Sequence, residues 1–306
     1  MEFLRILESI RMPGLNEFML LITQFGEETA FLVAALIMFW CFDKYRGYYL
    51  LSVGFIGTIL NQFMKLLFRI PRPWVADPNF TILEQAREAA AGYSFPSGHT
   101  QSAVGTFGAI AYTAKNRWVR IAAIAVAVLV PFSRMYIGVH TPQDVLVAAA
   151  MALALIFLLR PVVLGKTKKY IPALLVGMTV LAAGFLCFVE FFPFPADIDP
   201  HNLESGVKNA YTLAGSLLGL LVVYIADEKW LNFEVKAIWW AQLLKIAAGL
   251  GLVLAVKSGL KTPLNALLGE SVGRGARYFL IVVVAGILWP LTFRWFSKLG
   301  NKERGE

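Results

Sequence analysis

The sequence predicts an all-α fold, a polytopic transmembrane helical bundle with about nine spanning helices. Of the 306 residues, 58% are hydrophobic and only 16% are charged, whereas soluble chains contain roughly 45–50% apolar and about 25% charged residues. Runs of mainly apolar residues also recur along nearly the whole chain, and roughly 20 such residues are needed to cross a bilayer as a helix. Composition and run length together indicate one integral membrane domain.

Residues 1–26 are predicted to form an amphipathic segment at the membrane interface. Charged residues are spaced helically among apolar ones in the first fifteen positions, at Glu2, Arg5, Glu8 and Arg11. The segment lacks the uninterrupted apolar core of a signal peptide, so we expect it to be retained. Residues 16–26 are too short to span, and Gly26 before Glu27 and Glu28 predicts a bend ahead of the first full helix. Either these acids reach the headgroups or they face a polar interior.

Apolar runs bounded by charge, glycine or proline give the predicted spans. They are 27–42, 48–68, 97–114, 119–138, 142–159, 170–191, 207–226, 237–256 and 277–296. Lys245 and several glycines interrupt the eighth run. If this run does not cross the membrane, the count falls to eight. Lys245 itself either pairs with an acid, such as Glu27 or Glu28, or marks a second polar pathway. Residues 27–160 are interpreted as a core that carries three motifs, and residues 161–306 as additional transmembrane helices.

The basic residues predict how the chain is oriented. Those that follow the first, third and fifth spans share one side: Lys44, Arg46, Lys115, Arg117, Arg120, Arg160, Lys166, Lys168 and Lys169. The C-terminal Arg294, Lys298, Lys302 and Arg304 join them. Basic loops of membrane proteins are cytoplasmic as a rule, so we expect the C-terminus in the cytoplasm. The 192–206 loop contains acids and no Lys or Arg, which places the opposite face outside.

The composition argues against nucleic-acid binding and against a metal site or disulfide framework built from cysteines. The formal net charge is +8, but no basic stripe with interleaved aromatics exists outside the loops, so we expect no nucleic acid partner. The cysteines, Cys41 and Cys187, both fall in apolar runs. We expect them to pack there and to form neither a metal site nor a disulfide framework.

Three short motifs fall on the predicted outer face. The first runs from Lys65 to Arg72 and Pro73 at the end of the second span. The second is Pro96-Ser97-Gly98-His99 at the start of the third, and the last joins Ser133-Arg134 to His140 and Asp144 between the fourth and fifth. Lys65, Arg72 and Arg134 would therefore lie at one depth in the outer leaflet, where unpaired cations are costly. They require an anion, and guanidinium groups match phosphate oxygens well.

The second motif adds a helix start to these cations. The N–H groups of Ser97, Gly98 and His99 have no partner within the helix that follows Pro96, and phosphate suits such a terminus. Gly98 lets a ligand approach the backbone closely. The sequence thus predicts a phosphate-binding site.

Two of the three histidines lie in these motifs. His140 and Asp144 are four residues apart, so a helix starting at Pro142 would place the carboxylate beside the imidazole. An acid that accepts one ring N–H leaves the other nitrogen free to attack phosphorus. His140 is the predicted nucleophile, Asp144 its partner and His99 the general acid for the leaving group. The cations would meet the charge on the phosphoryl oxygens, so we expect neither a metal nor a cofactor.

The ordered combination K-x6-R-P, P-S-G-H and S-R-x5-H-x3-D closely resembles the signature of the type 2 phosphatidic acid phosphatase superfamily. The resemblance covers residues 48–160. It implies phosphate binding by Lys65, Arg72, Ser97, Gly98 and Arg134, and catalysis by His99, His140 and Asp144 through a phosphohistidine. Because the first motif follows the second span and further helices follow the core, the layout looks more like glucose-6-phosphatase and sphingosine-phosphate phosphatases than like six-helix bacterial members.

Alternative functions remain at this point. The first is a phosphatase for a lipid phosphate or polyprenyl pyrophosphate, with membrane lipids as its surroundings. A soluble sugar-phosphate phosphatase is the second, and a transporter or flippase that binds phosphate headgroups is the third. An intact nucleophile and acid disfavour transport, because binding needs only the cations. The sequence does not specify the lipid or the oligomeric state.

Overall fold

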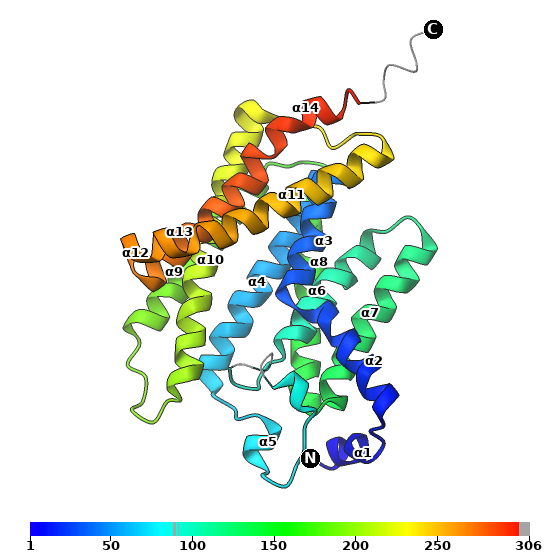
Figure 1. Ribbon diagram of the computed structural model, residues 1–306, viewed down its shortest axis with the longest axis vertical. Coiled ribbons are helices and arrows are strands. Elements are labelled where there is room, and N and C mark those ends of the chain that lie inside the picture. The colour runs from blue at the N-terminus through cyan, green and yellow to red at the C-terminus, as the bar shows by residue number, and fades with distance from the viewer. Residues whose placement is uncertain (88–89, 91, 300–306) are drawn as a thin grey trace. The chain divides into compact units, whose positions relative to one another are not determined.

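The computed structural model describes residues 1–87, 90 and 92–299 (Figure 1). All regular elements in these ranges are helical, as predicted. Lys302 and Arg304 of the predicted cytoplasmic tail lie outside the described residues.

The described residues form helices and no strands, in the following order along the chain. The first half contains α1 (Glu2–Ser9), α2 (Pro13–Thr23), η1 (Gln24–Gly26), α3 (Glu28–Ile37), η2 (Met38–Phe42), α4 (Lys44–Phe68), α5 (Pro73–Ala76), η3 (Glu84–Ala86), α6 (Gly98–Thr113), α7 (Arg117–Tyr136) and α8 (Pro142–Leu164). The second half contains α9 (Ile171–Phe191), α10 (Pro200–Ala226), η5 (Asp227–Leu231), α11 (Trp239–Gly259), α12 (Lys261–Leu268), α13 (Glu270–Val283), η6 (Val284–Leu288), η7 (Pro290–Thr292) and α14 (Phe293–Phe296).

The count of nine spans is not confirmed. Among the described residues, seven helical stretches are long and apolar enough to cross a membrane, and eight if the pair Pro13–Gly26 and Glu28–Phe42, bent by 55°, is one span. The difference lies in α6, whose 16 residues are fewer than the roughly 20 that a spanning helix needs. The stretch that the sequence left in doubt, around Lys245, is instead a continuous helix of 21 residues, α11.

The chain divides into two compact units. The first unit is Met1–Leu32, Leu50–Pro161 and Pro193–Gly206; the second is Val33–Tyr49, Val162–Phe192 and Val207–Glu306. All three motifs lie in the first unit. The division at residues 26 and 160 that the sequence suggests stays a prediction.

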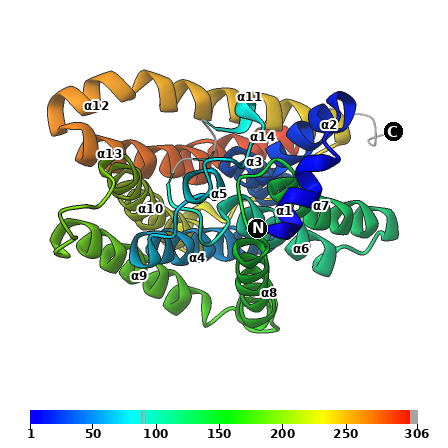
Figure 2. The same ribbon diagram turned by 90° about the horizontal axis from the view of Figure 1, so that it is seen from below.

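In the first unit, α1 is fastened to the loop that follows α5. Leu4 is buried against Phe80 and Ile82. Arg5 Nη2 donates to Asp77 Oδ2 at 2.6 Å, and Arg11 Nη1 donates to the carbonyl of Thr81 at 2.9 Å. Figure 2 shows α1 beside the end of α7, against which it packs. Phe3 and Ile6 of the same helix are exposed, and the interfacial position of this segment stays a prediction.

The amphipathic helix is shorter than the fifteen residues predicted. It ends at Ser9, and Pro13 then opens α2. Proline is favoured at the first position of a helix because its missing N–H would have no partner there. Proline therefore starts a second helix here and does not continue the first.

The bend predicted at Gly26 is present. The α2 and α3 segments meet there at 55°, and η1 packs on α6. A Cβ at Gly26 would lie 2.8 Å from Val130 Cγ1 and 2.9 Å from the His99 carbonyl oxygen. Only glycine permits this close approach of the bend to α6.

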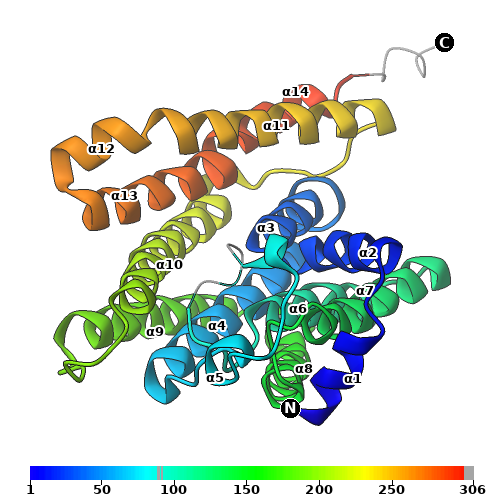
Figure 3. The ribbon, with the colours of Figure 1, turned by 60° about the horizontal axis from the view of Figure 1, so that its bottom comes forward.

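In the second unit, α11, α12 and α13 form a hairpin, and α11 runs alongside α13 (Figure 3). α13 also packs closely on α10, because a Cβ at Gly215 would lie 2.0 Å from the Gly275 carbonyl oxygen. Lys44 Nζ lies 2.9 Å from Asp227 Oδ2 near the cytoplasmic end predicted for these helices.

Lys245 and one of the two cysteines differ from expectation in this unit. Lys245 is fully buried, and its Nζ donates to the carbonyl of Val235 at 2.9 Å. The acceptor is thus a backbone carbonyl and not an acid. Cys41 is partly buried, as predicted, but Cys187 is exposed on α9, and both are free.

Candidate active site

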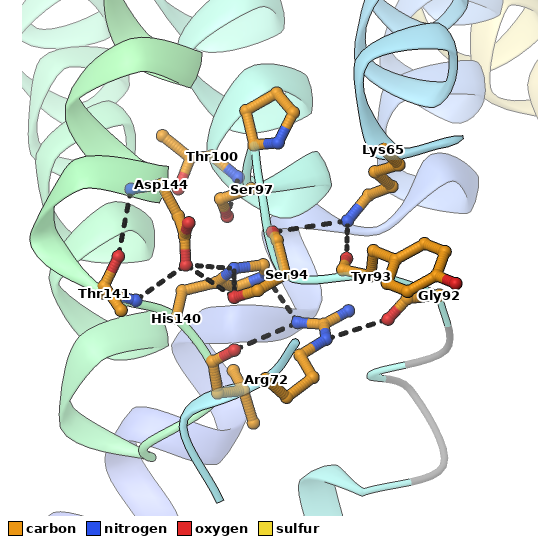
Figure 4. Close-up of polar contacts among 12 residues, drawn as sticks. Lys65, Arg72, Gly92, Tyr93, Ser94, Ser97, Thr100, His140, Thr141 and Asp144 are labelled. Atoms are coloured by element: carbon orange, nitrogen blue, oxygen red, sulfur yellow. Dashed lines mark hydrogen bonds and ion pairs between the residues drawn. The ribbon is translucent and has the colours of Figure 1, made fainter. Parts of the chain in front are cut away.

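The start of α8 positions Asp144. Thr141 precedes the helix, and its Oγ1 accepts a bond from the Asp144 N–H at 3.3 Å. Asp144 Oδ2 in turn accepts from the Thr141 N–H at 2.8 Å. This reciprocal pair is a capping box, which satisfies backbone donors that have no partner inside the helix. The local sequence T-P-Q-D therefore fixes the carboxylate beside His140 (Figure 4).

Three donors converge on Asp144 Oδ2. Besides the Thr141 N–H, they are His140 Nδ1 at 3.3 Å and the Ser94 hydroxyl at 2.6 Å. The side chains of Ser94, His140 and Asp144 are almost fully buried. Ser94 was not predicted from the sequence, because it lies three residues before Ser97 and outside the motif. Its nearness to Pro96 was the only available signal.

Arg72 fixes the other side of the imidazole. Its Nη1 lies 2.8 Å from His140 Nε2 and 3.0 Å from the Val139 carbonyl, and its Nε donates to the Gly92 carbonyl at 3.0 Å. A guanidinium only donates, so Nε2 carries a lone pair and Nδ1 carries the proton that faces Asp144. This tautomer is the one that a nucleophile attacking through Nε2 requires.

Electrostatics favour the same neutral form. Burial first, and then the positive charges of Arg72 and Arg134, hold the pKa of His140 well below 6.5. The charge of Lys65 acts in the same direction, as does that of His99. These four groups from separate segments are therefore close enough to act on one imidazole.

Lys65 is held at the end of α4. Its Nζ donates to the Tyr93 carbonyl and, at 3.4 Å, to the Ser94 carbonyl. One turn earlier, buried Asn61 donates from Nδ2 to the Pro96 carbonyl at 3.2 Å. Asn61 belongs to no motif and was not predicted from the sequence. Together the two side chains attach the 92–97 segment to α4.

The second motif opens α6 as predicted, with one difference. Ser97 is the N-cap, and its Oγ accepts from the Thr100 N–H at 3.3 Å. Its own N–H, expected to point outward, donates to the Asp144 carbonyl at 3.1 Å. That donor joins α6 to α8 and is not available to a ligand. Gly98 and His99 follow in the first turn, where N–H groups have no carbonyl within the helix, and His99 Nε2 is buried without a partner among the described residues.

Arg134 lies at the end of α7 and is 1% exposed. Its Nη1 donates to Thr23 Oγ1 at 2.8 Å, and within the described chain its Nε and Nη2 have no partner. The Glu27 carboxylate is near enough to interact with its charge. Thr23 and Glu27 thus bring the α2–α3 bend to the site, a contact for which the sequence offered only the open question about Glu27.

The structure brings all eight predicted residues into the first unit. His140, Asp144, Lys65, Arg72 and Ser97 are joined directly or through the Ser94 segment, and Gly98, His99 and Arg134 surround them. The described residues contain no group of three or more His, Cys, Asp or Glu side chains that could hold a metal ion. The roles of the eight residues stay predictions.

Comparisons with known proteins agree with this architecture. Residues 45–168 match the PAP2 superfamily, and residues 211–302 match the transmembrane extension of PAP2 superfamily phosphatases. No solved structure matches.

Curated relatives fall in the same group. The chain is 31% identical to undecaprenyl-diphosphatase BcrC of Bacillus subtilis, over 47% of this chain and 72% of the relative. It is 32% identical to phosphatidylglycerophosphatase B of the same organism, over 49% and 76%. Sphingosine-1-phosphate phosphatase 1 of Mus musculus is 25% identical over 78% of this chain and 58% of its own length. The chain is therefore an integral multi-pass membrane phosphatase that belongs to the PAP2 superfamily.

Proposed function

We propose that this phosphatase hydrolyses the phosphate or diphosphate group of a membrane lipid through a phosphohistidine at His140. The observation that carries the proposal is the orientation of one neutral imidazole, with Nδ1 toward Asp144 and Nε2 toward the cations. Relatives named for undecaprenyl diphosphate, phosphatidylglycerophosphate and sphingosine 1-phosphate support a lipid substrate.

The first step forms the bond between His140 Nε2 and phosphorus. The bond from phosphorus to the leaving oxygen breaks, its electron pair stays on that oxygen, and His99 supplies the proton. In the free protein, Arg72 contacts Nε2. As the substrate arrives, the same N–H group must donate to a phosphoryl oxygen instead. Lys65 and Arg134 meet the remaining charge on the equatorial oxygens.

The second step reverses the proton transfer. His99, now neutral, takes a proton from water, whose oxygen attacks phosphorus. The bond from phosphorus to Nε2 breaks, which returns its electron pair to the imidazole and releases phosphate. Asp144 stabilises the Nδ1–H throughout, as an orienting acid does in a catalytic triad.

The active site is proposed to face away from the cytoplasm. Basic residues lie where α6 ends and α7 begins, and again after α8, at the helix ends opposite those that carry the site. Basic loops are cytoplasmic as a rule. A substrate headgroup in the outer leaflet would then lie at the depth of Lys65 and Arg134.

The test is phosphate release from a panel of lipid phosphates, lipid diphosphates and water-soluble sugar phosphates. His140→Ala should lower kcat more than about a thousandfold, because it removes the nucleophile. The matched control is His201→Ala, which removes the third histidine, exposed in α10, and should stay within about twofold of wild type. Wild-type protein given labelled substrate and quenched in base should carry acid-labile phosphate that His140→Ala lacks. Turnover of sugar phosphates alone would overturn the lipid assignment, and full activity of His140→Ala would overturn the mechanism.

A further inference from the structure

A buried arginine in α13 plays no part in the site described above. Arg277 lies in the second unit and is 5% exposed. Its Nε and Nη1 are buried and have no hydrogen-bond partner among the described residues. An unpaired charge at membrane depth is expensive and marks a functional site by default. The guanidinium needs an anion.

The neighbouring sequence offers few acids to pair with it. Residues 235–299 contain one acid, Glu270, and eight basic residues, which are Lys236, Lys245, Lys257, Lys261, Arg274, Arg277, Arg294 and Lys298. Glu270 Oε1 lies 4.0 Å from Lys208 Nζ and opens α13 two turns before Arg277. The sequence from residue 235 to residue 299 therefore has a strong excess of positive charge.

A second cation lies beside the first. Arg274 donates from Nε to Thr212 Oγ1 on α10 at 2.9 Å, which leaves its terminal nitrogens for other acceptors. The guanidinium carbons of Arg274 and Arg277 lie 5.9 and 5.7 Å from the centre of the same ring, that of Tyr278. Two forked donors thus approach one aromatic side chain.

The position of Arg277 keeps it from reaching the aqueous phase easily. It is seven residues into α13, about 10 Å along the axis, on the buried face that also carries Gly273 and Ile281. A Cβ at Gly273 would lie 2.6 Å from the Leu264 carbonyl oxygen of α12. This face of α13 therefore packs against α12.

We propose that Arg277 and Arg274 form a second phosphate-binding site, separate from the active site and located in the transmembrane extension. Paired guanidinium groups suit phosphate oxygens, which accept several forked bonds at once. The phosphate is either the headgroup of an anionic lipid or free inorganic phosphate. The site needs no catalytic residue and does not rest on the proposed function.

The experiment measures thermal unfolding of the full-length protein in neutral detergent. Phosphatidylglycerol in mixed micelles is titrated in one arm, with phosphatidylcholine as the lipid reference, and inorganic phosphate in the other. Arg277→Gln should weaken the stabilising response to one of the anionic probes about tenfold or more, since bonds to charged groups are among the strongest. Without any probe, the same variant should raise Tm, because it removes a buried charge that has no partner.

The matched control is Arg294→Gln, which removes an exposed arginine of the same unit and should keep the full response. Turnover of a water-soluble phosphate ester should stay within about twofold in both variants, so this test and that of His140 fail independently.

A response to phosphatidylglycerol that depends on Arg277 assigns the lipid, and a response to inorganic phosphate that depends on Arg277 assigns the free ion. If Arg277→Gln lowers Tm in neutral detergent and keeps both responses, Arg277 is a structural residue and the proposal is overturned. If Arg277→Gln does not fold, Arg277→Lys is measured in its place. An unchanged response of Arg277→Lys likewise contradicts a site that needs a forked guanidinium.

Discussion

Single atoms decide the chemistry proposed for this site, and Asp144 Oδ2 is the most heavily used of them. It accepts from a backbone N–H, an imidazole and a hydroxyl. The motifs identified the acid and the imidazole. The hydroxyl of Ser94 was not predictable, because it reaches Asp144 only after a loop fifty residues earlier in the chain has folded onto α8.

Ser94→Ala should lower kcat about tenfold and leave KM within about twofold. The hydroxyl donates to a buried carboxylate, and such charge-assisted bonds contribute about 1.5–3 kcal/mol, so its loss loosens the acid that orients His140. Steady-state kinetics of the purified protein measure the change. Ser133→Ala is the control, because that buried hydroxyl donates to a carbonyl of its own helix at 2.7 Å. Equal activity of both variants would show that Ser94 does not position Asp144.

The acid limb of kcat/KM should lie below pH 6.5. Burial and neighbouring cations lower the pKa of His140, so the imidazole stays neutral as the pH falls from 7 to 6, where a free histidine becomes protonated. The folded protein then binds fewer protons than the unfolded chain, and stability falls as the pH drops below about 6.5. NMR titration of the imidazole, assigned with His140→Gln, measures this directly. A midpoint at or above 6.5 would contradict the environment described for His140.

At the scale of the elements, helix ends carry most of the site. Asp144 is placed by the cap of α8, His99 by the first turn of α6, and Arg134 by the last turn of α7. Capping signals are local in sequence, which is why these positions were predictable. The predicted end of α1 was too far along the chain. Hydrogen bonds from Arg11 to the carbonyls of Tyr136 and Thr81 hold the turn after α1, and such long-range bonds leave no periodic signal in the sequence.

The bend at Gly26 should be essential because it lies against α6. Gly26→Ala would bring a methyl group to within 2.9 Å of the His99 carbonyl oxygen, and overpacking of this kind costs about 1–3 kcal/mol. We expect a lower Tm and a kcat reduced about tenfold, because α6 carries His99. Gly14→Ala is the control: nothing lies within 4 Å of its new methyl group, and alanine favours the helix. A Gly26→Ala protein as active and stable as Gly14→Ala would refute the close contact.

At the scale of the whole molecule, hydrophobic run length was a good guide to the architecture and a poor guide to the span count. Seven of the predicted runs correspond to long apolar helices, and an eighth corresponds to the second half of the bent pair. The ninth, α6, is short, because an N-cap at Ser97 and the end at Thr113 limit it to 16 residues. The two units were not predictable, since each combines stretches that are distant in the chain.

The orientation can be tested with single cysteines introduced after Cys41 and Cys187 are changed to serine. In intact cells, a membrane-impermeant maleimide should label Asp197→Cys in the acidic loop. It should label Lys166→Cys in the basic loop only after the membrane is permeabilised, because basic loops stay inside. The two sites differ by one span, α9. Labelling in the opposite order would place the active site in the cytoplasm.

The hydrogen bond between Thr23 and Arg134 affects the design of chimeras between relatives. Thr23 lies before the region that matches the superfamily, which begins at residue 45, yet it provides the protein acceptor for an arginine proposed to hold phosphate. A chimera grafted at the family boundary would carry the guanidinium and leave its acceptor behind. Junctions that keep residues 1–44 with the transplanted catalytic region preserve this pairing.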